Sequence, residues 1–147
     1  MYLGKIAEVD LTSGNIAFRG YSTEMAETCL GGLGFNSWYL YRHVPLGSAL
    51  DPESVLAISC GLLTGTAAPA SSRIQISAKS PLSGLMGSSN VGGFLGVRLR
   101  ACGIRNLIIR GRSPRPVYLK VTPDGHAIKD AGRIWGLDTR ETEDKLT

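Results

Sequence analysis

The sequence has few of the residues that mark membrane, secreted or metal-binding chains. Its longest strongly apolar runs, such as residues 55–63, are too short to span a bilayer, and the first residues lack the layout of a signal peptide. The three cysteines, Cys29, Cys60 and Cys102, are far apart and form no C-x-x-C pair, which argues against a self-contained zinc or iron–sulfur site. We therefore expect a cytoplasmic protein with reduced thiols and no membrane partner.

Aromatic residues are scarce as well, at 7%, and the charge excess is modest, with 16 Lys and Arg against 12 Asp and Glu. No nucleic-acid recognition motif is present, and strand alternation would place neighbouring arginines on opposite faces, so we expect no nucleic-acid partner. A basic rim around an anionic small molecule explains the excess equally well. The basic residues of the weaker nucleic-acid hypothesis are Arg98, Arg100, Arg105, Arg110, Arg112 and Arg115.

What remains is a chain of 147 residues, 43% of them apolar, which is enough for one domain with a hydrophobic core. Alternating patterns predict more strands than helices, most of them antiparallel. We expect an α+β fold of mainly antiparallel sheets with a few short helices, forming a single domain over 1–147 that is incomplete at its C-terminal end, because the last helix lacks a cap. The strands are expected at 2–20 (a hairpin), 55–60, 73–79, 106–111 and 116–130 (a second hairpin), and the helices at 23–30, 34–44, 95–102 and from 137 onward.

Several chemically suggestive residues have simpler interpretations. The stretch GGLGFNS (31–37) superficially resembles a dinucleotide-binding fingerprint, but a helix is predicted before it and Ser37 replaces the third glycine, so helix capping is the better interpretation. His43 and His126 are predicted at a helix end and beside a turn, without a nucleophile pattern. Trp38 and Trp135 are expected in the core.

The stretch GSSNVGGFLG (87–96) is the strongest candidate for a ligand site. Its small residues would leave backbone N–H groups open, a helix would begin near Gly92, and Arg73 would stand at the start of the adjoining strand. Arginine suits phosphate because its planar fork donates two hydrogen bonds, and Asn90 offers an amide and a backbone carbonyl to a hard cation. Close packing of glycines on a sheet explains the same pattern, so the residues alone leave the two interpretations level.

Longer stretches of the chain resemble one known family. The segments GKIAEVDLTSGNI, LGGLGFNSWYLY and IWGLDTRETED, together with residues 61–121, are similar to the N-terminal domain of the aldehyde ferredoxin oxidoreductase family. Members are tungsten- or molybdenum-dependent oxidoreductases, including related acyl-CoA reductases. The resemblance covers nearly the whole chain in one register, which makes it more specific than any single glycine motif.

The resemblance implies a domain that seats a bis-pyranopterin tungsten or molybdenum cofactor, whose two phosphates are bridged by magnesium. Arg73 matches the arginine that reaches the pterin and the iron–sulfur cluster, Asn90 the residue whose backbone carbonyl contacts magnesium, and Gly92 the glycine beside a pterin. Ser88 stands where family members often carry an aspartate. The cofactor-binding residues expected on this basis are Arg73, Ser89, Asn90, Val91, Gly92 and Gly93.

The resemblance also implies what other parts of such an enzyme supply. The second pterin loop, the four-iron cluster cysteines and the acid/base residues match nothing here, so no catalytic residue is expected in this chain and the isolated 147 residues should show no turnover. The expected partners are the remainder of the oxidoreductase polypeptide, ferredoxin as electron partner, and a second copy in a homo-oligomer. The expected activity is oxidation of aldehydes to acids or a related low-potential reaction, and the alternative is a non-catalytic binding or assembly module with the same fold.

Overall fold

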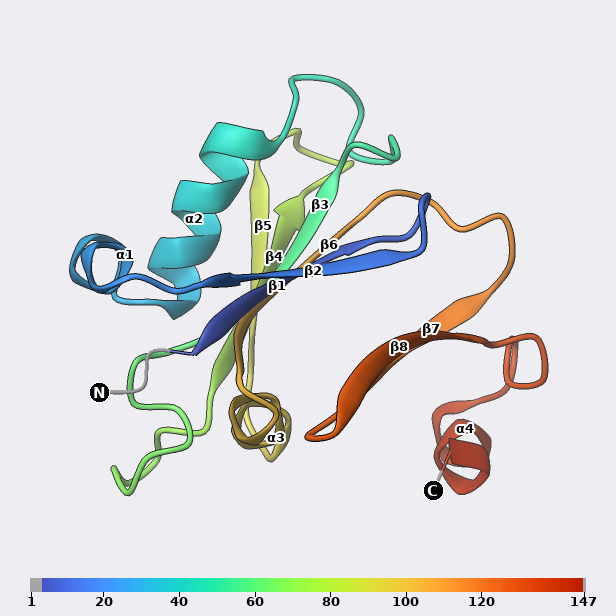
Figure 1. Cartoon of the computed structure of the whole chain (residues 1–147). Coiled ribbons are helices and arrows are strands. Elements are labelled where there is room, and N and C mark those ends of the chain that lie inside the picture. The colour runs from blue at the N-terminus through green and yellow to red at the C-terminus, as the bar shows by residue number, and fades with distance from the viewer. Residues whose placement is uncertain (1–3, 147) are drawn as a thin grey trace.

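A six-stranded mixed sheet forms the centre of the structure (Figure 1). The computed structural model describes residues 4–146. The strands of the sheet follow the order β2-β1-β6-β3-β4-β5, and β7 and β8 form a separate hairpin. The strands are β1 (Lys5–Asp10), β2 (Asn15–Gly20), β3 (Val55–Cys60), β4 (Ile74–Lys79), β5 (Met86–Val91), β6 (Ile104–Arg110), β7 (Val117–Thr122) and β8 (Gly125–Asp130), and the helices are α1 (Thr23–Cys29), α2 (Gly32–His43), α3 (Leu95–Ala101) and α4 (Thr139–Leu146).

The first hairpin follows from local turn chemistry. The Oδ1 atom of Asp10 accepts hydrogen bonds from the N–H groups of Thr12 at 2.9 Å and Ser13 at 3.1 Å, and Gly14 takes the left-handed conformation at φ 70°. These backbone donors, led by that of Ser13, lower the pKa of Asp10. The hairpin predicted for residues 2–20 is confirmed from Lys5 onward, and its first two residues lie outside the described part of the chain.

Helices α1 and α2 cover one face of the sheet (Figure 1). Ser22 caps α1 by accepting a hydrogen bond from the N–H of Met25 at 3.1 Å, and α2 ends at His43, before Pro45, so the helices expected at 23–30 and 34–44 are confirmed. Phe35 on α2 is fully buried between the rings of Tyr21 and Tyr39. The buried residues of this layer are Ile6, Tyr21, Ala26, Cys29, Phe35, Tyr39, Leu40, Val55, Ala57 and Ile108.

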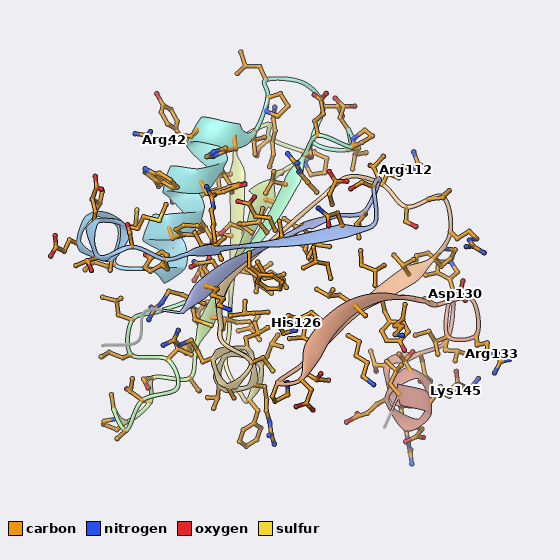
Figure 2. All side chains as sticks on the ribbon, in the orientation of Figure 1. Arg42, Arg112, His126, Asp130, Arg133 and Lys145 are labelled. Carbon is orange, nitrogen blue, oxygen red and sulfur yellow. The ribbon has the colours of Figure 1, made fainter. Side chains whose placement is uncertain are left out.

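Helix α3 and the β7–β8 hairpin pack on the opposite face. Leu99 of α3 joins Cys60 and Ile74 in one buried cluster, and Leu119 and Ile128 of the hairpin pack against a second cluster on β1 and β6. His126, near the start of β8, lies between the hairpin and the large sheet (Figure 2), and the centroid of its ring is 5.2 Å from that of Phe18 on β2. The hairpin is therefore attached to the sheet by side chains rather than by strand pairing.

The α+β fold with mainly antiparallel strands is confirmed, with one parallel pair, β1 and β6. Trp38 packs against Phe35 as expected, but the prediction that Trp135 is a core residue is wrong, because it lies in a turn and is 71% exposed. The last helix begins as predicted, with the Asp138 carboxylate accepting a hydrogen bond from the N–H of Glu141 at 2.8 Å.

Among the described helices, none combines the length and the apolar character needed to cross a membrane.

Candidate functional site

The small-residue stretch that the sequence predicts as an open loop is largely a β-strand. Residues 86–91 form β5 and pair along their whole length with β4 at the edge of the sheet. Helix α3 begins at Leu95, with Phe94 at its N-cap, and has seven residues; the helix expected at 95–102 is confirmed, but its N-terminus lies three residues beyond Gly92, near which the candidate anion site was expected to have it. Glycine and serine have low strand propensity, and pairing with a strand already built into the core overrides it.

The register of β5 shows which of its backbone groups remain open. In an antiparallel ladder, hydrogen-bonded and non-hydrogen-bonded pairs alternate. The N–H of Ser80 donates to the carbonyl of Leu85 at 2.7 Å just beyond the strands, so counting along the ladder makes Gln75↔Asn90 a non-hydrogen-bonded pair. The N–H and carbonyl groups of Asn90 therefore point away from β4, toward the open edge. The expectation of a row of open N–H groups from residue 87 to 93 is wrong, because within the strand only alternate residues face the edge.

Arg73 and Asn90 meet at this edge. Arg73 directly precedes β4, and its Nη1 donates a hydrogen bond to Oδ1 of Asn90; both residues are exposed. Asn90 Nδ2 donates in turn to Oε1 of Gln75 at 2.9 Å. One of the five guanidinium N–H donors is used on Asn90, and the exposed fork can present others to an anion.

Of the remaining predicted cofactor-binding residues, two lie within β5 beside Asn90 and two follow the strand. Ser89 and Val91 alternate with Asn90, so their side chains lie on the opposite face of the sheet, where Val91 packs in the apolar cluster of Ile74. Gly92 and Gly93 follow the strand in the open: a Cβ built on either would have no atom within 4 Å. Gly93 has φ 85°, a conformation that glycine adopts without strain. The structure thus brings Arg73 and Asn90 into contact, leaves the two glycines unobstructed just after the strand, and turns the side chains of Ser89 and Val91 to the other face.

Sequence reasoning missed the polar residues that support Asn90. The Nε2 of Gln75 donates to Oγ of Ser88, and Ser88 Oγ lies 3.1 Å from Oγ of Ser77, which is 1% exposed. The signal was present in RIQISAK (73–79), where Arg73, Gln75 and Ser77 alternate with apolar residues. That alternation indicates a polar face on β4, although an interior strand beneath a helix is expected to be apolar there.

This candidate site is an open surface, and the larger cavities lie elsewhere. One cavity of about 700 Å³ lies beside the C-terminal end of α2 and is lined by the predicted surface residue His43, whose Nδ1 is 2.9 Å from the carbonyl of Tyr39. A second, of about 690 Å³, lies between α2 and the turn before β5. Across residues 4–146, no three His, Cys, Asp or Glu side chains gather as a metal site.

The thiols are consistent with the expectation of reduced cysteines. Cys29 and Cys60 are buried, Cys102 is half-buried, and all three are free. Burial raises the pKa of the Cys60 thiol to about 11 and also raises that of Cys29. Both buried thiols therefore stay protonated near neutral pH, where the thiol is a weak nucleophile.

The arginines of the nucleic-acid hypothesis do not share a surface. Arg105 is fully buried, with its guanidinium over the Tyr21 ring and its Nη1 donating to the carbonyl of Gly61 at 3.3 Å. Arg112 follows β6 and lies next to the tip of the β1–β2 hairpin (Figure 2), where its N–H donates to Oγ1 of Thr12 at 2.9 Å. Arg98 and Arg100, in contrast, belong to α3. Because Arg105 is buried, the six arginines cannot all contribute to the exposed basic patch that non-specific nucleic-acid binding needs.

Comparisons with known proteins identify relatives over almost the whole chain. The family model described as aldehyde ferredoxin oxidoreductase, N-terminal domain, matches residues 6–147. The tungsten-containing aldehyde ferredoxin oxidoreductase of Pyrococcus abyssi (strain GE5 / Orsay) is 38% identical over 99% of this chain and 24% of that protein. The aliphatic sulfonate oxidoreductase, WOR-like subunit, of Pyrococcus furiosus is 33% identical over 92% of this chain and 22% of its own length.

A solved structure is similar over the same region. The active-site complex BamBC of benzoyl coenzyme A reductase, determined with 1,5-dienoyl-CoA, contains a chain that is 37% identical and matches with a TM-score of 0.94. The match covers 98% of this chain and 22% of that one. The chain thus spans about a quarter of the length of the relatives it matches.

Proposed function

This chain belongs to the aldehyde ferredoxin oxidoreductase family, as its N-terminal domain, and on that premise we propose that it seats one phosphate-bearing half of a tungsten pterin cofactor. The observation that carries the proposal is the Arg73–Asn90 contact at the open edge of β5. Arg73 would supply fixed positive charge for a phosphate, and the outward backbone carbonyl of Asn90 would supply an oxygen ligand for a magnesium ion.

The residues around this pair fit a large cofactor. The open surroundings of Gly92 and Gly93 would let a large cofactor approach the backbone there. Ser89 and Val91 would take part through their position in the strand, since their side chains face away. A tungsten pterin supplies the redox chemistry when bound, and the residues of this chain bind, orient and neutralise it.

For the complete protein we propose oxidation of aldehydes to acids, or a related low-potential reaction, with ferredoxin as electron partner and a cytoplasmic location. A four-iron cluster would be held by residues outside this chain, because Cys29 and Cys60 are buried and no three His, Cys, Asp or Glu side chains gather in residues 4–146. The relatives with similar identity differ in their named reactions, which include aldehyde, sulfonate and acyl-CoA chemistry. Cofactor seating is therefore the role we assign to this domain, and substrate choice belongs to the rest of the polypeptide.

The test is the tungsten and pterin content of the complete protein carrying Arg73→Ala. We expect this variant to hold the cofactor at least about tenfold more weakly, because hydrogen bonds to charged groups contribute about 1.5–3 kcal/mol each. Arg112→Ala is the matched control, since Arg112 is an exposed arginine beside Thr12 in the β1–β2 turn, and the β1–β2 hairpin and β5 lie at opposite edges of the sheet. Full cofactor retention by Arg73→Ala would contradict the proposal.

A further inference from the structure

A chain of polar side chains runs from the exposed edge of β5 into the core beneath α2. Each member lies within hydrogen-bond distance of the next, across the strands β5, β4, β3 and β6 and helix α2. We call this set the polar chain. Its members, from the surface inward, are Arg73, Asn90, Gln75, Ser88, Ser77, Asn36, Ser59 and Asn106.

The inner half of the polar chain is buried and held from several sides. Asn36 of α2 is 0% exposed, and its Nδ2 lies 3.0 Å from Oγ of Ser77, 3.2 Å from the carbonyl of Ala57 and 3.1 Å from that of Gln75. Its Oδ1 accepts from the Ser59 hydroxyl at 2.5 Å. Side chains linked in this way in a low-dielectric interior have little freedom to rotate, so Ser77 is a fixed anchor.

The outer half has only one arrangement of donors and acceptors. An arginine donates and never accepts, so the amide oxygen of Asn90 must face Arg73 and its amide nitrogen must face Gln75. The oxygen of the Gln75 amide then faces Asn90, and its nitrogen faces Ser88. The orientation of the Asn90 amide is thus set on one side by Arg73 and on the other by Gln75, which reaches the buried Ser77 through Ser88.

We propose that Gln75 and Ser88 are positioning residues, which tie Asn90 to the buried Ser77 and so hold the Arg73 guanidinium in the direction that a phosphate requires. This inference rests on the proposed function of the Arg73–Asn90 edge. Without the link, Arg73 is a long, exposed side chain next to an exposed amide, and each must be ordered when the anion binds. Ordering a flexible side chain costs binding free energy that a preorganised one has already lost.

The competing explanation is that the polar chain only fastens α2 to the sheet. That role belongs to its inner members, since Asn36 contacts both β3 and β4 through their carbonyl groups. Ser88 belongs to the outer half: it is exposed, lies on the edge strand, and its side chain joins the polar chain through hydroxyl contacts with Ser77 and Gln75. A substitution at Ser88 therefore tests the positioning of Arg73 with less effect on folding than a substitution at Asn36.

The experiment compares Ser88→Ala, Ser88→Thr and Gln75→Met in the complete, cofactor-loaded protein. The measurements are the rate at which tungsten is released from the protein and the midpoint of thermal unfolding. We expect Ser88→Ala and Gln75→Met to release tungsten about three- to tenfold faster, which corresponds to one lost hydrogen bond. Ser88→Thr, which keeps the hydroxyl on a strand-favouring residue, should restore the original rate. Ser54→Ala is the matched control, since it loses one hydroxyl contact to a backbone carbonyl at 3.0 Å far from this edge.

The outcomes distinguish this inference from the function on which it rests. If Arg73→Ala releases tungsten quickly but Ser88→Ala and Gln75→Met do not, the positioning role is wrong and the proposed function stands. If release from Ser88→Ala follows a loss of thermal stability and Ser88→Thr does not restore it, the residue is structural and the inference is overturned. If Arg73→Ala itself retains tungsten, both are overturned.

Discussion

Gly31, between α1 and α2, gives the most direct test of how this fold is held together. It is the N-cap of α2, with φ 86° and ψ −170°, and it forms an isolated antiparallel bridge with Gly61 at the end of β3. A Cβ added there would lie 2.8 Å from the backbone carbonyl oxygen of Cys60. Gly31→Ala therefore places a side chain in a conformation that almost only glycine adopts and against an atom that cannot rotate away.

Two costs add at this position. Holding a non-glycine residue in that region of backbone space costs about 1–3 kcal/mol, and forcing a methyl group into a closed contact costs a further 1–3 kcal/mol or so. We expect Gly31→Ala to lower the free energy of unfolding by about 2–6 kcal/mol. Because a domain of this kind is stable by about 5–15 kcal/mol, that loss takes a large part of the total.

Urea unfolding followed by tryptophan fluorescence measures this change, since Trp38 packs against Phe35 in the same layer. Gly14→Ala is the matched control, because Gly14 also has positive φ, at 70°, but a Cβ there meets nothing within 4 Å. We expect the control to lose only about 1–2 kcal/mol, the cost of the left-handed conformation alone. Equal losses in the two variants would show that the contact with Cys60 carries no energy and that the close approach is misjudged.

Three further predictions follow from buried or linking groups. Asn36→Leu should lower the free energy of unfolding by about 2–4 kcal/mol, measured in urea, because it leaves buried serine hydroxyls without their partner. Burial raises the pKa of Cys60 from 9.0 to about 11, so its contribution to stability is present below pH 9 and is lost as the pH rises through 11; Cys60→Ala should flatten that alkaline loss in pH-dependent unfolding. Lys79→Met should make the loop after α2 more sensitive to limited proteolysis, because Lys79 Nζ donates to the carbonyls of residues 45–47.

Much of the fold could be predicted because local rules decide it. The first hairpin follows from alternation and turn residues, α1 from the serine cap, and the end of α2 from Pro45. The parallel pairing of β1 with β6 could not be read locally, since the two strands are far apart in the chain and pair through the shared core. The strand β5 was missed because its composition, MGSSNV, is typical of a loop, and only its ladder with β4 shows it to be a strand.

The candidate site was predictable in its residue types but not in its geometry. A basic residue at the start of one strand and the small residues that follow that strand predicted a phosphate cradle, and the structure brings Arg73 and Asn90 into contact. The prediction relied on a continuous row of open N–H groups and on a helix N-terminus near Gly92, whereas the structure leaves open the backbone groups of alternate residues of β5 and begins α3 at Leu95. What the residues form instead is a sheet edge, where alternation decides which groups face outward. Register is a property of the pair of strands, so no single stretch of sequence could supply it.

The position of β5 at the edge of the sheet offers a reason for the small residues in its sequence, MGSSNV. Edge strands in natural proteins are commonly protected by charged side chains, proline or a bulge, because their open backbone groups invite pairing with another chain. The six residues of β5 include no charged residue and no proline, and their register with β4 is regular. Under the proposed function, the open backbone groups of Ser88 and Asn90 have a partner in the bound cofactor and its metal ion, and bulky protective side chains would block its approach. The same small residues that make β5 a poor strand by propensity would then be the ones that a cofactor-seating edge requires.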